Sequence, residues 1–360
     1  MTVPSNPIYG PPSEALRALT PSQLTFLQNL PKAELHAHLN GSIPLPILQD
    51  LARTYIASDS TPSSDVVQAG LQQLQSGVQL VEINDFFGLF PAIYALTSTP
   101  LALRKATRGV LSHFLGPVPV EGEGRENVVQ EVSYLELRTT PRDTPAMSRR
   151  VYLETVLAEV ESYAPESAAL IVSLDRRMSQ DVAEEVVELA AKLREEGRRV
   201  VGVDLCGDPL AGDVAIFTAI FEKAKQAGLG VTLHIAETAK NPPEETLKLL
   251  SCTPARLGHA TFLNEEAKKV VHDHKICIEI CLTSNLLCKT VQSLDDHHIR
   301  YYLKHNHPIA ICTDDILPFR NSMLGEYALL LAPKPYGLGL TESEVETIAR
   351  MSMECRFPLP

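Results

Sequence analysis

Short apolar segments recur along the chain and alternate with longer stretches whose apolar residues are spaced as on one face of a helix. Compact apolar runs are typical of strands buried in a parallel sheet, and the spaced stretches are typical of amphipathic helices that cover such a sheet. Eight runs are predicted as strands: residues 33–39, 134–139, 169–174, 200–205, 230–236, 256–260, 277–283 and 309–313. Amphipathic helices are predicted over residues 181–196, 213–227, 264–273 and 293–305.

A strand followed by a helix, repeated eight times, predicts an α/β fold of the (β/α)8 TIM barrel type. The first repeat departs from the rest, because residues 44–117 separate the first two strands. We interpret them as helical insertions over the mouth of the barrel, with a helix over residues 83–96 and a solvent loop over residues 116–125. Residues 1–20 are predicted to be a loose N-terminal segment that leads into a helix over residues 21–29.

Composition and charge exclude several classes of partner. A chain of 360 residues with 44% hydrophobic residues is long enough to bury one large core. The formal net charge of −12 repels nucleic acid and anionic membrane surfaces, so neither is expected as a partner. The sequence shows neither a membrane-spanning run nor a signal peptide, and its seven cysteines include no C-x-x-C pair. We therefore expect a monomeric cytoplasmic protein with reduced cysteines, in which residues 1–360 form a single domain.

The first predicted strand carries two histidines, His36 and His38, two positions apart. Side chains two apart on a strand point to the same face, so the pair supplies half of a zinc site. Taken alone, such a pair more often consists of one histidine packed in the core and the other on the surface. The interpretation as a metal site depends on what the rest of the chain supplies.

Other polar residues end later strands, where the active sites of such barrels lie. Three histidines and a carboxylate suit zinc, which leaves one coordination position open for water in catalytic sites. The candidate ligands are His36, His38, His234 and Asp314, with His259 and Asp315 at neighbouring strand ends. The ion is predicted as a single Zn²⁺, because the fourth strand ends without a lysine that would bridge two metals; another divalent ion remains an alternative.

Glu237 follows His234 by three residues, at a point where the chain has left the fifth strand. A carboxyl group beside a metal-activated water is a natural general acid and base. The alternative for Glu237 is a solvated loop residue. Glu279 is a second unusual carboxylate, because it lies within an apolar strand; we expect it to orient His259 or another pocket group, or else to face solvent.

The motifs together resemble those of the adenosine deaminase superfamily over residues 30–356. They are Glu34-Leu-His-Ala-His-Leu-Asn-Gly-Ser42, Asp204-Leu-Cys-Gly-Asp208, His234-Ile-Ala-Glu237, Gly258-His259 and Thr313-Asp314-Asp315. Four segments are similar to the adenosine deaminase-like branch, whose members deaminate N6-methyl-AMP: Leu39-Asn-Gly-Ser42, Tyr134-Leu-Glu-Leu-Arg-Thr-Thr-Pro-Arg142, Asp175-Arg-Arg177 and Cys281-Leu-Thr-Ser-Asn285.

The resemblance implies a hydrolytic deaminase in which zinc activates water for attack on C6 of a purine. Glu237 would donate a proton to ring N1, and His259 would orient the attacking hydroxide and help to move its proton. Asp315 would hold the incoming water or purine N7. The implied reaction converts N6-methyl-AMP and water to IMP and methylamine.

The resemblance also implies a set of substrate contacts. They are His38, Asn40, Tyr94, Thr139, Thr140, Pro141, Arg142, Asp175, Gly207 and Asp315. The run 139–142 offers hydroxyls, backbone amides and a guanidinium to a monophosphate, although it is also compatible with an ordinary turn that ends a strand. Asp175 suits the ribose hydroxyls, or it pairs with Arg176 or Arg177. Two alternative functions stay open: a deaminase of free adenosine, and a catalytically inactive barrel that binds purines.

Overall fold

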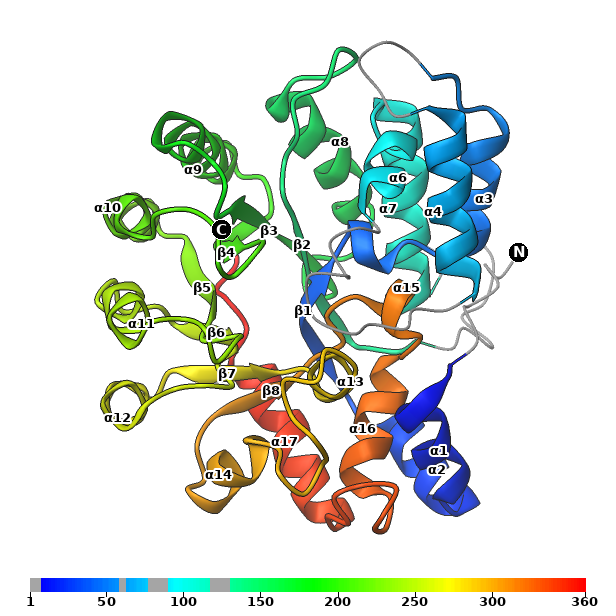
Figure 1. Cartoon of the computed structure of the whole chain (residues 1–360), viewed down its shortest axis with the longest axis vertical. Helices are drawn as coiled ribbons and strands as arrows, with labels where there is room; N and C mark the ends of the chain where they lie inside the picture. The colour runs from blue at the N-terminus through cyan, green and yellow to red at the C-terminus, as the bar shows by residue number, and fades with distance from the viewer. Residues whose placement is uncertain (1–7, 58–62, 77–89, 117–129) are drawn as a thin grey trace.

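Eight parallel strands in sequential order form a nearly closed barrel in the computed structural model, which describes residues 8–57, 63–76, 90–116 and 130–360 (Figure 1). The predicted (β/α)8 barrel is therefore confirmed. The strands are β1 (Ala33–His38), β2 (Tyr134–Thr139), β3 (Ala168–Asp175), β4 (Val200–Cys206), β5 (Gly230–Ile235), β6 (Arg256–His259), β7 (Cys277–Ile280) and β8 (Ile309–Ile311). Nearly every strand residue is buried, as expected for strands enclosed on both faces.

The first and last strands meet at a short seam. A single parallel bridge joins Ala37 to Asp314, and the Asp314 backbone N–H donates to the His36 carbonyl over 2.8 Å. The Glu34 carboxylate spans the same seam, because it accepts from the Thr313 backbone N–H at 2.9 Å and from the Thr313 hydroxyl at 2.7 Å. The seam thus brings the strand that carries His36 and His38 next to the segment that carries Asp314.

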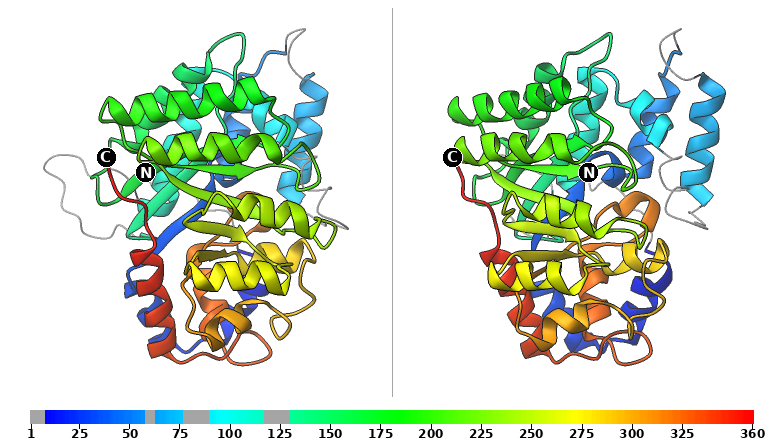
Figure 2. Two further views of the ribbon diagram at one scale, coloured as in Figure 1. Left: turned by 90° about the vertical axis from the view of Figure 1, so that its left-hand side faces the viewer. Right: turned by 60° about the vertical axis from the view of Figure 1, so that its left-hand side comes forward.

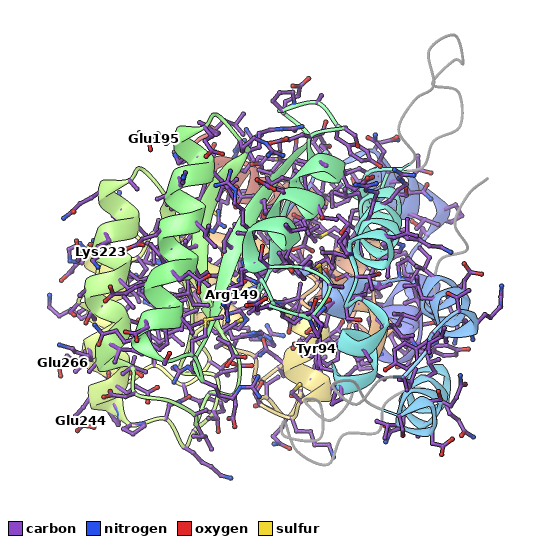
Figure 3. All side chains as sticks on the ribbon, turned by 90° about the horizontal axis from the view of Figure 1, so that it is seen from above. Tyr94, Arg149, Glu195, Lys223, Glu244 and Glu266 are labelled. Atoms are coloured by element: carbon purple, nitrogen blue, oxygen red, sulfur yellow. The ribbon has the colours of Figure 1, made fainter. Side chains whose placement is uncertain are left out.

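Helices surround the barrel (Figures 1 and 2). The outer ring includes α8 (Arg149–Val160), α9 (Gln180–Glu195), α10 (Ala215–Gln226), α11 (Pro243–Leu250), α12 (Glu265–Asp273), α14 (Ile299–Lys304) and α17 (Glu342–Glu354). In Figure 3 the charged side chains of Glu195, Lys223, Glu244 and Glu266 lie on the outer rim of this ring. The apolar faces of the ring helices pack on the strands, which explains the helical spacing of apolar residues in the sequence. In the described part of the chain no helix is long and apolar enough to cross a membrane.

The long first insertion forms a group of helices beside β1 and β2 (Figure 1). They are α3 (Leu45–Arg53), α4 (Ser64–Ser76), α6 (Phe90–Leu96) and α7 (Pro100–Leu115). A short 3-10 helix, Asn40–Ser42, leads into them from β1. The predicted helix over residues 83–96 is observed from residue 90 onward, and its earlier part lies outside the described residues, as does most of the predicted loop over residues 116–125.

Three predicted boundaries were wrong. Residues 10–18 of the supposedly loose N-terminus form α1 (Gly10–Ala18), which packs on α16 (Met323–Leu331) with Ala15 fully buried. The seventh strand ends at Ile280, and the apolar run continues as α13 (Leu282–Leu287). The helix predicted over residues 293–305 begins only at residue 299. In each case tertiary packing decided what the local pattern left open.

The end of the barrel opposite the strand carboxyl ends is closed by Phe357, whose side chain is 6% exposed. The guanidinium carbon of Arg256 lies 3.7 Å from the centre of the Phe357 ring. The Phe357 backbone N–H donates to Glu136 at 2.7 Å. This aromatic contact leaves the strand carboxyl ends as the accessible mouth of the barrel.

Candidate active site

Four side chains from three strand ends converge at the mouth of the barrel. His36 and His38 project from β1, His234 from β5, and Asp314 follows β8. The Nε2 atoms of His38 and His234 lie 3.1 Å apart, and Asp314 Oδ1 lies 3.5 Å from His36 Nε2 and 3.7 Å from His38 Nε2. The structure therefore brings together all four side chains that the sequence nominated as metal ligands.

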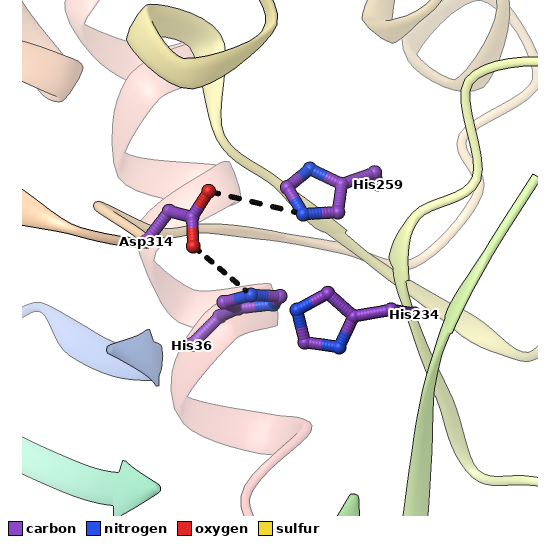
Figure 4. A group of neighbouring side chains, drawn as sticks. All are labelled: His36, His234, His259 and Asp314. Carbon is purple, nitrogen blue, oxygen red and sulfur yellow. Dashed lines mark ion pairs between the residues drawn. The ribbon is translucent and has the colours of Figure 1, made fainter. Parts of the chain in front are cut away.

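His259 completes the group from the end of β6 (Figure 4). Ligand atoms of His36, His234, His259 and Asp314 all lie within 4.8 Å of one another. The Asp314 carboxylate faces two imidazoles, because its Oδ2 atom lies 3.8 Å from His259 Nε2 while Oδ1 faces His36. His38 belongs by the same measure to a second group, with Asp204 and Cys206. Three imidazoles and one carboxylate thus face one another, and His38 adjoins them through His234 and Asp314.

The rings of His36 and His234 are held from behind by carboxylates inside the barrel. Glu279 Oε2 lies 2.7 Å from His36 Nδ1, and Asp204 Oδ1 lies 3.1 Å from His234 Nδ1, which also lies 2.9 Å from the Leu205 carbonyl. An Nδ1–H donated to these acceptors leaves Nε2 as the lone-pair nitrogen that faces the other ligands. His36 Nε2 is buried and faces Asp314 Oδ1 at 3.5 Å.

The electrostatics of the cluster favour a cation. Burial lowers the pKa of His36, but hydrogen bonds to Asp314 and Glu279 outweigh burial and raise that pKa to about 9. Burial would raise the pKa of Asp314, yet the surrounding histidines hold it well below its ordinary value. The site therefore concentrates negative charge around Nε2 lone pairs. This donor set fits a divalent metal ion, and it fits zinc in particular because zinc takes nitrogen and oxygen ligands.

Local backbone geometry aims two of these residues. His259 has a φ of 59° and Asp314 a φ of 64°, both in the left-handed region that non-glycine residues rarely adopt. Gly258 makes room for the neighbouring ring, because a Cβ at this position would lie 2.8 Å from His36 Cε1. Nothing in the local sequence signals these conformations.

Glu237 lies just beyond β5 and lines the same cavity. Its Oε1 atom is 3.8 Å from His259 Nε2, and its side chain is 14% exposed. Burial raises the pKa of Glu237, and the nearby Asp314 carboxylate adds to the rise. A carboxyl group that holds its proton more tightly than usual suits a general acid near neutral pH.

The two remaining predicted catalytic residues are buried beside Glu237. Burial lowers the pKa of His259 to about 3, so the ring is neutral at physiological pH. Asp315 is 3% exposed and its Oδ1 atom has no hydrogen-bond partner among the described residues. Burial, Asp314 and Glu237 together raise the pKa of Asp315 well above its ordinary value.

A cavity of about 500 Å³ opens over this cluster, within the range usual for small-molecule sites. Nine of the ten predicted substrate contacts line it: His38, Asn40, Tyr94, Thr139, Thr140, Arg142, Asp175, Gly207 and Asp315. Pro141 does not line it and is buried. Proline has no amide hydrogen to offer a ligand, so its place in the predicted phosphate-binding run is that of a spacer.

The sequence suggested Arg142 as a phosphate contact, but in the structure its guanidinium is bonded to α6 and the residue that follows it. Its terminal nitrogens donate to the carbonyls of Tyr94 at 2.9 Å and Thr97 at 3.2 Å, and to the Thr97 hydroxyl at 2.8 Å. The guanidinium carbon lies 4.5 Å from the centre of the Tyr94 ring, whose place on α6 is labelled in Figure 3. The buried Nε atom of Arg142 has no hydrogen-bond partner among the described residues. Arg142 thus holds the α6 wall of the cavity through its two terminal nitrogens.

Asp175 pairs with Arg177, one of the two partners considered from the sequence. Arg177 donates through Nε to Asp175 Oδ1 at 2.8 Å and through Nη2 to Oδ2 at 2.6 Å. Gly207, with a φ of 98°, lies against the same carboxylate, since a Cβ there would be 2.9 Å from it. The Arg177 side chain is 59% exposed and lines the cavity, which adds a cation that sequence reasoning did not place in the site.

Three further groups were missed or assigned only loosely. Ser284 donates to Asp314 Oδ2 at 2.7 Å, and the only signal for it was its place in a motif shared with the resembled branch. Glu279 was expected to orient a pocket histidine, and it holds His36 and not His259. Arg138 was quoted within a motif without a role, yet it lies fully buried beneath the histidines.

Comparisons with known proteins bear on this geometry. A family model described as adenosine deaminase matches residues 31–358. The chain is 36% identical over 361 residues to a curated protein of Arabidopsis thaliana named N6-mAMP deaminase, covering 93% of this chain and 94% of the relative. It is 33% identical over 351 residues to the human protein named N6-Methyl-AMP deaminase, covering 94% and 91%.

Solved structures of proteins with similar names also resemble this chain in fold. The apo structure of the N6-methyl-AMP deaminase from Arabidopsis thaliana has a TM-score of 0.78 and 34% identity, covering 93% of this chain and 94% of that one. Two structures of an Arabidopsis protein named ADAL, complexed with GMP and with IMP, each have a TM-score of 0.79 and 34% identity. Alignment with them covers 93% and 92% of this chain, respectively, and 94% of each of those chains.

Proposed function

The chain belongs to the adenosine deaminase family of metal-dependent aminohydrolases, and on that premise we propose that it is a zinc enzyme acting on purine nucleoside monophosphates. The proposed reaction converts N6-methyl-AMP and water to IMP and methylamine. The observation that carries the proposal is the convergence of His36, His38, His234 and Asp314 beside the buried Glu237, beneath a cavity with guanidinium groups in its wall. The names of the relatives and the nucleotide complexes of ADAL support the choice of substrate.

The proposed zinc ligands are His36, His38, His234 and Asp314. A zinc ion held there would supply a Lewis acid that makes water nucleophilic near neutral pH. The protein's own contribution to this step is orientation, because Glu279 and Asp204 fix the two imidazoles whose Nε2 atoms face the centre.

Glu237 acts on the purine ring in this proposal. Attack at C6 pushes an electron pair toward ring N1, and a proton from Glu237 keeps that charge from accumulating. The raised pKa of Glu237 suits this role, because the group must carry its proton at neutral pH. Neutral His259, 3.8 Å from Glu237, is placed to take the proton from the attacking water, with Asp315 holding the water or purine N7.

The ribose and phosphate contacts follow from the cavity wall. Asn40 is 6% exposed and lines the cavity, as His38 does, and its Oδ1 atom has no hydrogen-bond partner among the described residues. In the proposal a 5′-phosphate accepts hydrogen bonds from the Thr140 hydroxyl and from the Nε–H of Arg142, which has no partner among the described residues; both residues line the cavity. Asp175 accepts from the ribose hydroxyls. Charge-assisted hydrogen bonds of this kind bind a monophosphate in spite of the acidic net charge of the chain.

An absorbance assay of the purified protein on N6-methyl-AMP, AMP and adenosine, with bound metal quantified in the same sample, tests the proposal. We expect turnover of the nucleotides, N6-methyl-AMP above AMP, and about one zinc per chain. Efficient turnover of adenosine alone would transfer the function to a nucleoside deaminase. No activity on any of the three would favour the inactive purine-binding barrel.

Arg142→Ala tests the phosphate contact, and Thr97→Val is its matched control. Both variants remove the hydrogen bond from Arg142 to the Thr97 hydroxyl, but only Arg142→Ala removes the guanidinium. We expect Arg142→Ala to lower kcat/KM for the nucleotide by about tenfold to a hundredfold, while turnover of adenosine changes as little as in Thr97→Val. Equal losses on nucleotide and nucleoside would refute a phosphate contact at Arg142.

A further inference from the structure

Arg138 lies inside the barrel, beneath the histidine cluster, and contacts the two carboxylates that hold the histidines. Its side chain is 0% exposed on β2. Its Nη2 atom donates to Glu279 Oε2 at 2.8 Å on β7, and its Nη1 atom lies 3.3 Å from Asp204 Oδ1 on β4. Nη2 also donates to the Leu35 carbonyl on β1. One guanidinium therefore connects four strands.

The contacts fall on the same oxygen atoms that orient the imidazoles. Glu279 Oε2 is the atom that lies 2.7 Å from His36 Nδ1, and Asp204 Oδ1 is the atom that lies 3.1 Å from His234 Nδ1. Each oxygen thus lies between Arg138 on one side and a histidine on the other: Arg138 donates a hydrogen bond to Glu279 Oε2 and contacts Asp204 Oδ1 as an ion pair. The planar guanidinium holds its nitrogens in a rigid fork, so it constrains the spacing of the two oxygens and offsets their negative charge.

We propose that Arg138 is a positioning residue that sets His36 and His234 in register with each other, through Glu279 and Asp204, so that metal affinity depends on it. Without the guanidinium, Glu279 and Asp204 would lose the cation that contacts both of them. Apart from its histidine, each would keep a contact only at its other oxygen, from Arg256 and Thr232 to Glu279 Oε1 and from Ser173 to Asp204 Oδ2, so the oxygens that face the imidazoles would be less constrained. The two Nε2 lone pairs would then no longer converge reliably on one point. The inference rests on the proposed metal site and is independent of the proposed substrate.

A second buried arginine supplies the control. Arg256 is equally buried and contacts the same Glu279, but through the other oxygen, with Nε 2.8 Å from Oε1. Its second partner is Glu136, at 2.6 Å, on the side of the barrel closed by Phe357. Within the described part of the chain, Arg256 forms no hydrogen bond or ion pair with Asp204 or a histidine. The two arginines therefore share burial and ion pairing but differ in their connection to the metal ligands.

The test compares Arg138→Met and Arg138→Lys with Arg256→Met and Arg256→Lys in the full-length chain. Metal affinity is measured by chelator competition with Zn²⁺, and ligand geometry by the visible spectrum of the Co²⁺-loaded protein. Thermal unfolding reports the structural cost. We expect Arg138→Met to weaken metal binding by about tenfold or more and to change the Co²⁺ spectrum, and Arg138→Lys to restore part of the affinity. The Arg256 variants should lower the unfolding temperature while metal affinity stays close to that of the parent.

The outcomes separate this inference from the proposed function. A parent chain that binds zinc, together with Arg138 variants of unchanged affinity and spectrum, would overturn the role of Arg138 and leave the zinc site standing. Equal loss of affinity in the Arg138 and Arg256 variants would also overturn it, because burial alone would then explain the loss. If Arg138→Met does not fold, the comparison of the two lysine variants decides. A parent chain that binds no divalent metal would refute the metal site and this inference together.

Discussion

Replacing Glu237 with glutamine removes one dissociable proton from the cavity and conserves the size and shape of the side chain. The substitution should cost little stability. Glu237 forms no hydrogen bond with the described residues, and its neighbour His259, which is neutral near pH 7, lies 3.8 Å away. We therefore expect the unfolding free energy to change by less than about 1 kcal/mol.

The effect on rate should be far larger. A general acid in the transition state contributes about 10²–10⁴ in rate, which corresponds to about 2.7–5.5 kcal/mol of activation free energy. Because Glu237 supplies the proton only as C6 is attacked, kcat should fall by this factor while KM changes little. Metal content should be unchanged, since Glu237 is not among the proposed ligands.

The assay is the absorbance change of N6-methyl-AMP under saturating and limiting substrate, with zinc content and thermal unfolding measured on the same preparation. Glu237→Asp is a useful companion, because it keeps the acid and withdraws it by one methylene. It should retain more activity than Glu237→Gln. A glutamine variant with a near-normal kcat would refute the assignment of Glu237 as the acid, and a variant that lost its zinc would show a different role for the residue.

Three further predictions concern the site and its support. Gly258→Ala should reduce zinc retained after dialysis by about tenfold or more, because its Cβ would lie 2.8 Å from the His36 ring and displace it; full retention would contradict this. Phe357→Ala should lower the unfolding free energy in denaturant titration by about 3–5 kcal/mol, whereas Leu359→Ala, 40% exposed, should change it by less than about 0.5 kcal/mol. Burial raises the pKa of Glu326 to about 7 from 4.5, so the folded chain holds a proton that the unfolded chain releases, and parent stability falls as pH rises through that window. Glu326→Gln should therefore gain stability relative to the parent from about pH 5 to about pH 8, and a parallel pair of stability curves would contradict the shift.

Most of the barrel was predictable because its strands are short and buried on both faces. For β2 the apolar run and the observed strand coincide, and elsewhere the ends differ by a residue or two. The error at β7 has a physical cause: Leu282 and its neighbours are as apolar as the strand, so composition carries no mark of the turn after Ile280. In the same way α1 depends on α16, a partner more than 300 residues distant, which a local pattern does not reveal.

The candidate site was predictable wherever polar residues interrupt an apolar strand end, as at His234 and Asp314. The sequence could not show in which direction each side chain points. The Arg142 side chain turns to α6 because carbonyls are available there, and Arg138 turns inward because Glu279 and Asp204 are buried beneath the histidines. These choices depend on the three-dimensional neighbourhood of each guanidinium, and sequence spacing does not record it.

The seam between the first and last strands has a consequence for the growing chain. Glu34 and Thr313, which close it, are 279 positions apart in the sequence, and His36 and Asp314 lie on the same junction. Contacts of such long range are expected to form late in folding, because the intervening chain must be closed first. A chain in which this seam has not formed lacks the junction that joins His36 to Asp314. The proposed metal site would therefore be complete only after the barrel has closed, so metal uptake would report on the folded molecule.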